Sequence, residues 1–140
     1  MFLSNQCPHV LHALPEILMI AADYRVQGLG IIAINSNQPF MNSGESPEMS
    51  SEFAFRNSID FPYLLDDAKE AAGWLQAKIT PDFYLFDNQN QLFYHGQLDD
   101  SRPGNNIPLS GSDLRNAIDG VIYNRTISDP QKPSVGCDIK

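Results

Sequence analysis

Near its amino end the sequence reads SNQCPHV, residues 4–10. Three apolar residues, 1–3, precede this stretch, and apolar side chains at helical spacing follow it. Pro8 is the residue type that proteins favour at the first position of a helix. The pattern therefore predicts that Cys7 lies where a short strand passes into a helix.

A cysteine at the start of a helix has distinctive chemistry. It meets backbone N–H groups that have no partner within the helix, and it meets the positive end of the helix dipole. Both favour the thiolate over the thiol, so we expect the pKa of Cys7 to lie below that of a free cysteine. A reactive thiol also needs partial exposure. The position alone therefore leaves two interpretations open, a reactive cysteine and a buried structural one.

The composition is that of an ordinary globular protein. The chain has 140 residues, of which 42% are hydrophobic, and this is enough for one domain with a core. The formal net charge of −8 argues against nucleic acid and anionic membranes as partners. No apolar run approaches the roughly 20 residues of a membrane-spanning helix. No signal peptide is visible either, and we expect a cytoplasmic protein.

The sequence has two cysteines, Cys7 and Cys137, at opposite ends of the chain. A pair this far apart forms one structural disulfide, one catalytic disulfide or no bond at all. A cytosolic setting argues against the first of these. The sequence leaves the choice between the other two open.

The first part of the chain predicts a βαβ unit. A helix is expected over residues 8–27, with Pro15 inside it and Gly28 after its end. The continuous apolar run 31–34 predicts a strand that is covered on both faces, as in a parallel sheet. Together with the strand at residues 1–3, these elements form a unit whose crossover should be right-handed.

Two further helices are predicted in the middle of the chain. Ser46-Pro47 signals the start of one, with serine as its cap and proline at its first position. Residues 61–65 then predict a short buried strand. Asp66 or Asp67 is expected to cap the next helix, which carries Trp74, the single tryptophan of the sequence. We expect Trp74 to pack against the core.

The second half of the chain predicts a hairpin and a last helix. Residues 82–87 and 91–97 are its two strands, joined by a polar turn. A polar loop follows over residues 99–106, and the last helix is expected to begin near Ser110 or Ser112.

The tail of the chain is expected to be irregular because prolines and a glycine interrupt it. We therefore divide the chain into a domain over residues 1–126 and a tail over 127–140 that carries Cys137. The order of the predicted elements is β-α-β-α-(β)-α-β-β-α, which is the order of a thioredoxin-like fold.

Three groups of residues resemble a known family. SNQCPHV resembles the redox-active segment of thioredoxin-like proteins, in which CxxC opens the helix after a central strand. Thr80-Pro81 resembles the cis-proline that faces this segment. DDSRPGN, residues 99–105, and SVGCDIK, residues 134–140, are similar to a bacterial subgroup known as redoxin or AhpC/TSA-like thioredoxin-family proteins. The resemblance implies an α/β thioredoxin-like fold with a central mixed β-sheet flanked by helices.

The chain departs from that family in three places. Ser4 stands where CxxC has its first cysteine, and a serine hydroxyl cannot replace a thiolate at neutral pH, so the ordinary dithiol cycle is lost. The chain starts inside the first core strand, so the N-terminal strand or hairpin of the family is expected to be truncated. The aromatic residues that the family carries after GCxIK are absent.

Ser4, Cys7 and Pro8 also fit the short motif of peroxiredoxins, in which a hydroxyl three residues before the cysteine binds the thiolate or the peroxide. Attack on peroxide gives a sulfenic acid, which a second thiol condenses into a disulfide. The resemblance makes Cys7 the reactive cysteine and Cys137 the candidate resolving thiol. Peroxiredoxins also need an arginine that polarises the peroxide, and Arg102 is the candidate here.

The polar residues near the candidate site also have alternative roles. A loop salt bridge with Asp99 or Asp100 is the alternative for Arg102, and both aspartates are expected to be solvated loop charges. His9 and His12 share one side of the first helix, but no further cysteine clusters nearby. We expect no metal and no cofactor.

Pro8, Thr80 and Pro81 are the candidate substrate-binding residues. If the Thr80-Pro81 bond is cis, as the resemblance implies, the Thr80 backbone lies beside Cys7 and pairs with an extended substrate. A trans proline that ends the preceding helix is the alternative.

Two functions compete. The first is a thiol-dependent redox protein, either a peroxiredoxin-like peroxidase or a monothiol-type thiol–disulfide oxidoreductase, in which Cys7 is recycled by Cys137 or an external thiol. Its partners would be an external thiol reductant or a protein disulfide. The second is a non-catalytic thioredoxin-fold binding module, suggested by the loss of the first cysteine. A third interpretation treats Ser4 as an engineered replacement. The oligomeric state is not readable from the sequence.

Overall fold

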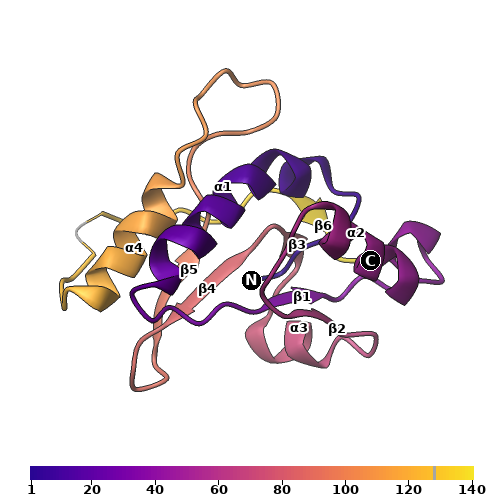
Figure 1. Cartoon of the computed structure of the whole chain (residues 1–140), viewed down its shortest axis with the longest axis horizontal. Helices are drawn as coiled ribbons and strands as arrows, with labels where there is room; N and C mark the ends of the chain where they lie inside the picture. Colours follow the sequence, from indigo (N-terminus) through magenta and orange to yellow (C-terminus); the bar gives the residue numbers. More distant parts are fainter. Residues whose placement is uncertain (128) are drawn as a thin grey trace.

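The computed structural model describes residues 1–127 and 129–140. Figure 1 shows the elements in chain order. They are α1 (Pro8–Arg25), β1 (Ala33–Asn35), the 3₁₀ helix η1 (Ser43–Glu45), α2 (Pro47–Arg56), β2 (Tyr63–Leu65), α3 (Glu70–Leu75), β3 (Ile79–Thr80), β4 (Phe83–Phe86), β5 (Leu92–Gly96), α4 (Ser112–Ile122) and β6 (Cys137–Asp138). The described part of the chain is thus a small mixed α/β structure.

Phe2 lies at the centre of a layer of short strands. Its backbone bridges Ile34 in parallel and Asp82 in antiparallel orientation. On one side of this bridge β1 pairs in parallel with β2, and on the other β4 pairs antiparallel with β5. The layer is therefore mixed. Residues 4–7 follow directly from its centre, which places the start of α1 at the end of the layer.

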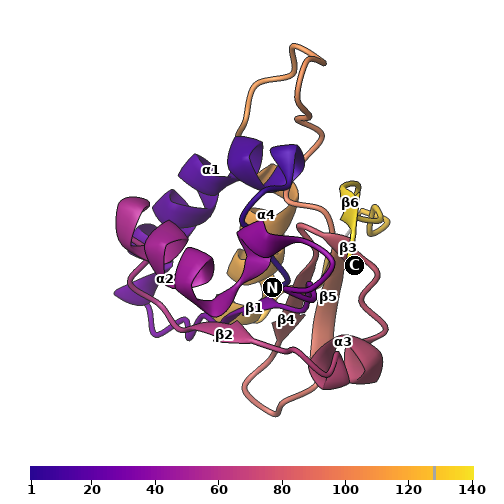
Figure 2. The ribbon, with the colours of Figure 1, turned by 90° about the vertical axis from the view of Figure 1, so that its right-hand side faces the viewer.

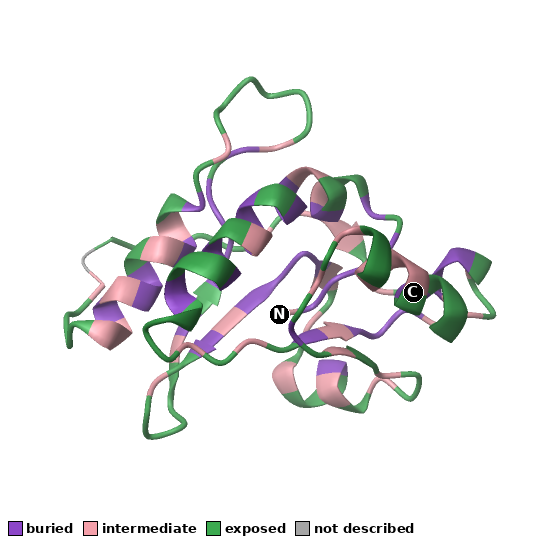
Figure 3. Ribbon diagram, in the orientation of Figure 1, coloured by how far each residue is buried: buried purple, intermediate pink, exposed green. Residues whose placement is uncertain are grey.

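Helices cover both faces of the layer, with α1 and α4 on one face and α3 on the other (Figure 2). The inner sides of α1 and α4 are buried together with much of β4 (Figure 3). Burying one large aliphatic or aromatic side chain stabilises a fold by about 1.5–3 kcal/mol, so this cluster fixes α1 firmly. From these three elements it includes Val10, Ile17, Ile20, Phe83, Leu85, Ala117 and Ile118. No helix among the described residues is both long and apolar enough to traverse a membrane.

The helix starts that the sequence predicted are confirmed. α1 begins at Pro8, although it ends at Arg25 rather than near residue 27. α2 begins at Pro47, and the Ser46 hydroxyl accepts a hydrogen bond from Met49 N at 3.2 Å. α4 begins at Ser112. The starts of α1 and α2 depend on local chemistry, which a sequence shows directly.

The strand over residues 31–34 is shorter and less buried than predicted. β1 begins only at Ala33, and Ile32 is 51% exposed. In β2, Leu64 is 49% exposed. Among the described residues β2 has only β1 as a neighbour in its sheet, so its outer edge is unpaired. The exposure of Ile32 contradicts the expectation that the run 31–34 is covered on both faces, and the exposure of Leu64 contradicts the expectation that residues 61–65 are buried.

The helix after Asp66 is confirmed, but its packing differs from the prediction. The Asp66 carboxylate accepts hydrogen bonds from the backbone N–H groups of Ala71 and Ala72, at 3.2 and 3.0 Å. α3 is a short helix of 6 residues. Trp74 is 83% exposed, so the expectation that it packs in the core is wrong. Ala72 is the buried side chain of α3 instead.

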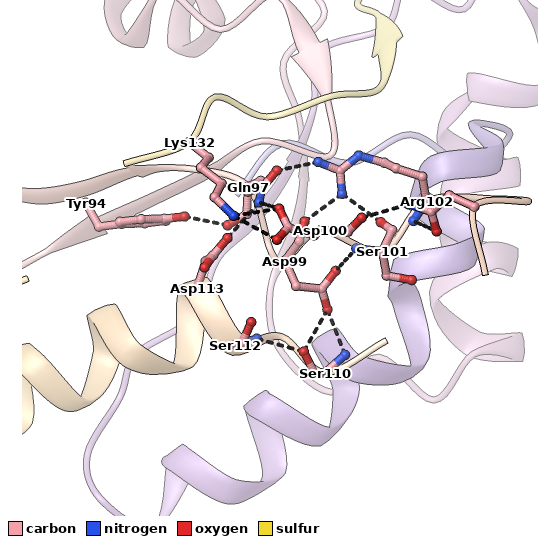
Figure 4. A network of polar contacts seen from close by, with 11 residues as sticks. Tyr94, Gln97, Asp99, Asp100, Ser101, Arg102, Ser110, Ser112, Asp113 and Lys132 are labelled. Atoms are coloured by element: carbon pink, nitrogen blue, oxygen red, sulfur yellow. Dashed lines mark hydrogen bonds and ion pairs between the residues drawn. The ribbon is translucent and has the colours of Figure 1, made fainter. Parts of the chain in front are cut away.

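Asp99 is buried, with 2% exposure, and it organises the loop before α4 (Figure 4). Its carboxylate accepts hydrogen bonds from the backbone N–H groups of Ser101, Ser110 and Gly111, at 2.8, 2.7 and 2.6 Å. The expectation that Asp99 is a solvated charge is wrong, because three backbone donors replace water around the carboxylate. Asp100 is exposed, as expected.

We expect Asp99→Asn to lower the free energy of unfolding by about 1–3 kcal/mol, because the new NH₂ group leaves at least one buried backbone N–H without an acceptor. Urea unfolding followed by circular dichroism measures the change. Asp67→Asn, at an exposed carboxylate, is the matched control, and it should stay within about 0.5 kcal/mol of the parent protein. Equal effects of the two substitutions would contradict the role given to Asp99.

Candidate functional site

Cys7 is the cap residue at the amino end of α1. Its backbone is extended (φ −70°, ψ 121°), and its carbonyl oxygen accepts the first helical hydrogen bond, from Leu11 N at 3.0 Å. Pro8 occupies the first helical position, as predicted. The Cys7 side chain is only 3% exposed. The sulfur therefore lies at the positive end of the helix but beneath other groups of the protein.

One of the residues that cover Cys7 is Cys137. The two cysteines form a disulfide, with their Cα atoms 6.0 Å apart although 130 positions separate them in the sequence. This Cα separation lies within the usual range for a disulfide. The structure thus brings together the two cysteines that the sequence analysis named as candidate reactive and resolving residues.

A pair of short strands carries Cys137 to the site. β6 lies antiparallel to β3, with Cys137 opposite Thr80 and Asp138 opposite Ile79. Beyond β6, Ile139 N donates a hydrogen bond to the carbonyl oxygen of Lys78 at 2.9 Å. The expectation that the whole tail is irregular is wrong, since β6 gains its hydrogen bonds from a distant segment.

Before β6, polar contacts fix the tail to the strand layer. The Ser134 hydroxyl donates to Asp82 Oδ1 at 2.7 Å. Lys132 accepts a hydrogen bond from Gln97 N at its carbonyl oxygen, and its ammonium group lies 2.7 Å from Asp100 (Figure 4). These contacts position the tail independently of the disulfide.

After β6, the last residue of the chain is bound as well. Lys140 N donates to Asn37 Oδ1 at 2.9 Å, and Gln38 N donates to the carbonyl oxygen of Lys140 at 2.6 Å. Both partners lie in the loop that follows β1. The tail is therefore held on both sides of Cys137.

Thr80 and Pro81 lie beside the disulfide, and the peptide bond between them is cis. The Thr80 carbonyl oxygen is 3.3 Å from Cys7 Sγ. A disulfide sulfur carries no proton, so this contact becomes a hydrogen bond only when Cys7 is a thiol. Both residues are buried, whereas Pro8 is exposed. Of the three predicted substrate-binding residues, the structure thus brings Thr80 and Pro81 to the disulfide and leaves Pro8 at the adjacent surface.

Ser4 faces a carboxylate that the sequence analysis missed. Its hydroxyl donates a hydrogen bond to Glu45 Oε1 at 2.6 Å. Glu45 is 2% exposed and also accepts from Asn5 N at 2.9 Å and from Asn35 Nδ2 at 2.7 Å. Gln6 N adds a longer hydrogen bond of 3.2 Å. The segment that leads into Cys7 is therefore anchored on one buried carboxylate.

Asn5 extends this anchor towards α2 and β2. Its side-chain amide donates to Gly44 O and to Ser50 Oγ, both at 2.9 Å, and its oxygen accepts from the Tyr63 hydroxyl at 2.8 Å. Burial, together with the charge of Glu45, raises the pKa of Tyr63, so its hydroxyl remains a donor. Glu45 directly precedes Ser46, the cap residue of α2. The capping motif identifies the start of the helix, but it does not show that the Glu45 side chain accepts a hydrogen bond from Ser4.

Arg102 uses its guanidinium group within its own loop. Nη1 donates to the carbonyl oxygens of Asp99 and Ser101, at 2.6 and 2.7 Å, and Nη2 bonds the side-chain oxygen of Gln97 (Figure 4). Among the described contacts, neither the expected ion pair with an aspartate nor a bond to Cys7 occurs. The polarising role of Arg102 stays a prediction.

His9 and His12 line a small pocket near the start of α1, which Pro81 and Arg102 also line. The pocket holds about 20 Å³, room for little more than one water molecule. Burial is the main cause that lowers the pKa of His9, and the charges of Arg102 and His12 add to it. His12 Nε2 lies 2.7 Å from the Ser101 hydroxyl. Among the described residues, no three side chains gather as a metal site requires.

No protein-family model and no curated protein matches the sequence. Two solved structures are similar over the whole chain. One is a hypothetical protein from Sinorhizobium meliloti, with 41% identity and a TM-score of 0.96, covering 99% of this chain and 76% of that protein. The other is an uncharacterized conserved protein from Geobacillus kaustophilus, with 44% identity and a TM-score of 0.97, covering 100% of this chain and 74% of that protein.

The chain belongs to the family of these two proteins. The alignment covers nearly all of this chain, so Cys7, Glu45 and the tail that carries Cys137 all lie within the part that resembles the family members in fold. The names of the two relatives assign no activity.

We expect reduction of the Cys7–Cys137 disulfide to lower the free energy of unfolding by about 2–5 kcal/mol, because the bond closes a very long loop and restricts the unfolded chain. Urea unfolding with and without dithiothreitol measures the change. The variant with both Cys7→Ala and Cys137→Ser is the control and should not respond to dithiothreitol. An unchanged midpoint in the parent protein would contradict a stabilising disulfide.

We expect Glu45→Gln to lower the free energy of unfolding by roughly 2–3 kcal/mol, because it removes the charge and one acceptor oxygen from a buried site where every partner is a donor. Thermal and urea unfolding measure this loss. Glu70→Gln, at an exposed position, is the control and should change stability by less than about 0.5 kcal/mol.

Proposed function

We propose that the protein is a thiol-dependent redox protein with a thioredoxin-like arrangement, which cycles between the Cys7–Cys137 disulfide and two thiols. The observation that carries the proposal is the disulfide between a cysteine at a helix start and a cysteine 130 positions away. Two electrons and two protons interconvert the two states. A mixed strand layer with α1 and α4 on one face and α3 on the other supports the proposed fold.

Cys7 is the reactive thiol. In the reduced protein its sulfur lies where the unpaired N–H groups of the first turn of α1 stabilise negative charge. The same groups make Cys7 the better leaving group when the disulfide is attacked. The anchored segment before it, from Ser4 to Gln6, fixes the position of the sulfur relative to the helix.

Cys137 is the resolving cysteine. Oxidation begins when the Cys7 thiolate attacks a peroxide oxygen, which leaves sulfenic acid on Cys7 and releases the alcohol or water. The Cys137 thiol then attacks the Cys7 sulfur, the S–S bond forms, and water leaves. A protein disulfide is the other oxidant that fits, and it would give the same final state by two thiol exchanges.

An external thiol reverses the cycle. Its thiolate attacks the sulfur of Cys137, because Cys137 is partly exposed and Cys7 is buried. The S–S bond breaks, Cys7 leaves as the thiolate, and the external thiol is bound to Cys137. A second external thiolate then attacks the external sulfur of this mixed disulfide, and Cys137 leaves as the thiolate. The two external thiols are thereby oxidised to one disulfide.

The binding-module alternative has one observation in its favour. Ser4 occupies the place of a nucleophile but has its hydroxyl committed to Glu45, and Cys7 is 3% exposed. In that case the disulfide only fastens the tail. The two functions differ in how fast the reduced protein forms the disulfide again.

The deciding experiment treats the fully reduced chain with an equimolar amount of hydrogen peroxide and maps peptides by mass spectrometry without reductant. We expect the Cys7–Cys137 disulfide to form within seconds. Cys7→Ala should abolish peroxide consumption, and Cys137→Ser should stop at Cys7 sulfenic acid, which dimedone labels. A Cys7 thiol that oxidises no faster than free cysteine would overturn the proposal in favour of the binding module.

The pH dependence of alkylation gives a second test. In Cys137→Ser, iodoacetamide should modify Cys7 with an apparent pKa below the value of about 8.5 for free cysteine, because the helix start stabilises the thiolate. The folded protein and the same protein in urea form the matched pair. Equal pKa values of Cys7 in the folded and the urea-unfolded protein would contradict stabilisation of the thiolate by the start of α1.

A further inference from the structure

One buried nitrogen near the start of α1 has no hydrogen-bond partner. It is Nδ1 of His9, and among the described residues Oγ1 of Thr80 is the only other buried side-chain nitrogen or oxygen of this kind. A buried polar atom without a partner destabilises a fold, so it calls for an explanation. The two atoms differ in their chemistry, because an imidazole nitrogen accepts a proton near neutral pH and a hydroxyl oxygen does not. His9 is therefore the candidate for proton transfer.

The small pocket that His9 lines borders the segments that meet at the disulfide. His9 lies in the first turn of α1, two residues after Cys7. The pocket is also lined by Pro81, which directly follows β3, and by Val135, which lies two residues before Cys137. In the disulfide neither sulfur carries a proton, so no S–H group is there to bind Nδ1. A thiol at this place would supply the donor that Nδ1 lacks.

The other charged or titratable residues that line this pocket are bound to other groups. They are His12 of α1, and Asp99 and Arg102 of the loop before α4. The Asp99 carboxylate accepts from three backbone N–H groups, and the Arg102 guanidinium donates within its loop. The Ser101 hydroxyl donates its proton to a backbone carbonyl oxygen, so its contact of 2.7 Å with Nε2 of His12 uses the His12 N–H group as the donor. His9 is the base of this pocket that remains uncommitted.

The surroundings keep His9 neutral. Burial is the largest cause that lowers its pKa, and the charges of Arg102 and His12 lower it further. A histidine whose pKa lies below the ordinary value of 6.5 is mostly uncharged at pH 7. With the ring proton on Nε2, Nδ1 has a lone pair that accepts a proton.

Cys137 is the cysteine that needs such a base. The thiolate is the nucleophile, so a thiol must lose its proton before its sulfur attacks. Cys7 has the start of α1 to stabilise its thiolate, whereas Cys137 lies in the strand β6. In the resolution step of the proposed cycle Cys137 attacks Cys7 sulfenic acid, and a proton must also reach the hydroxyl group that departs.

We propose that His9 is the general acid–base residue of this resolution step: Nδ1 takes the proton of the Cys137 thiol and delivers it to the hydroxyl group that leaves Cys7. The S–S bond forms, the S–O bond breaks, and the leaving group departs as water. His9 ends the step neutral, as it began. The inference rests on the proposed function and adds the group that moves the proton.

The test follows the two chemical steps separately after fully reduced full-length protein is mixed with one equivalent of hydrogen peroxide. Dimedone trapping at timed intervals measures Cys7 sulfenic acid, and peptide mapping without reductant measures the disulfide. In His9→Gln we expect sulfenic acid to accumulate, with disulfide formation at pH 7 slower by about a hundredfold or more, because a general base contributes that much to a proton transfer. His12→Gln, one turn further along α1 at the same pocket, is the matched control and should form the disulfide at the parent rate.

The pH profile distinguishes loss of a base from loss of packing. In the parent protein the rate of disulfide formation should stay level as the pH falls to 7 and decline only below about 6.5, where His9 takes up its proton. In His9→Gln the rate should fall roughly tenfold for each pH unit between pH 8 and 6, because only the thiolate fraction of Cys137 then reacts. A His9→Gln protein with the parent rate, or with a slower rate but the parent profile, would overturn the inference. A parent protein that forms no Cys7 sulfenic acid would instead overturn the proposed function.

The parent protein also offers a check that does not depend on the folding of a variant. Nuclear magnetic resonance of the reduced protein follows the titration of each histidine through its ring C–H signals. The decline of the disulfide-forming rate at low pH should coincide with the titration of His9. A decline that coincides with His12 or His95, or a rate that does not decline, would contradict the role given to His9.

Discussion

The pairing of β6 with β3 is the interaction on which the arrangement of the site depends. It places Cys137 opposite Thr80, and so brings a second sulfur to the buried start of α1. The pairing itself requires that Gly136 has no side chain, because its backbone passes against the carbonyl group of Thr80. A two-residue strand would be weak alone. Two further contacts stabilise the position of β6: Ser134, before the strand, binds Asp82, and Lys140, after it, binds Asn37.

Two buried carboxylates perform the same physical task at different places. Glu45 gathers donors from the segment before Cys7, and Asp99 gathers donors from the loop before α4. Each carboxylate replaces its water shell with hydrogen bonds from backbone N–H groups and side chains, which keeps the charge stable inside the protein. These hydrogen bonds hold the segment before Cys7 and the loop before α4 in place.

Local patterns predicted the elements well and their surroundings less well. The helix starts at Pro8 and Pro47 and the hairpin of β4 and β5 follow from residue types within a few positions of each other. The exposure of Ile32 and of Trp74 depends on which neighbours cover a face, and no short window of sequence contains those neighbours. Asp99 shows the same limit, because its donors come from residues up to 12 positions away.

The sequence by itself determined that Cys7 stands at a helix start and that Cys137 is its only possible partner within the chain. It also determined that position 4, three residues before Cys7, is a serine and not a second cysteine. Only the tertiary structure decided that the two cysteines are bonded, that Ser4 faces Glu45, and that Arg102 serves its own loop. The physical reason is distance along the chain. A contact across 130 positions arises from strand pairing and close backbone approach, and neither leaves a local pattern.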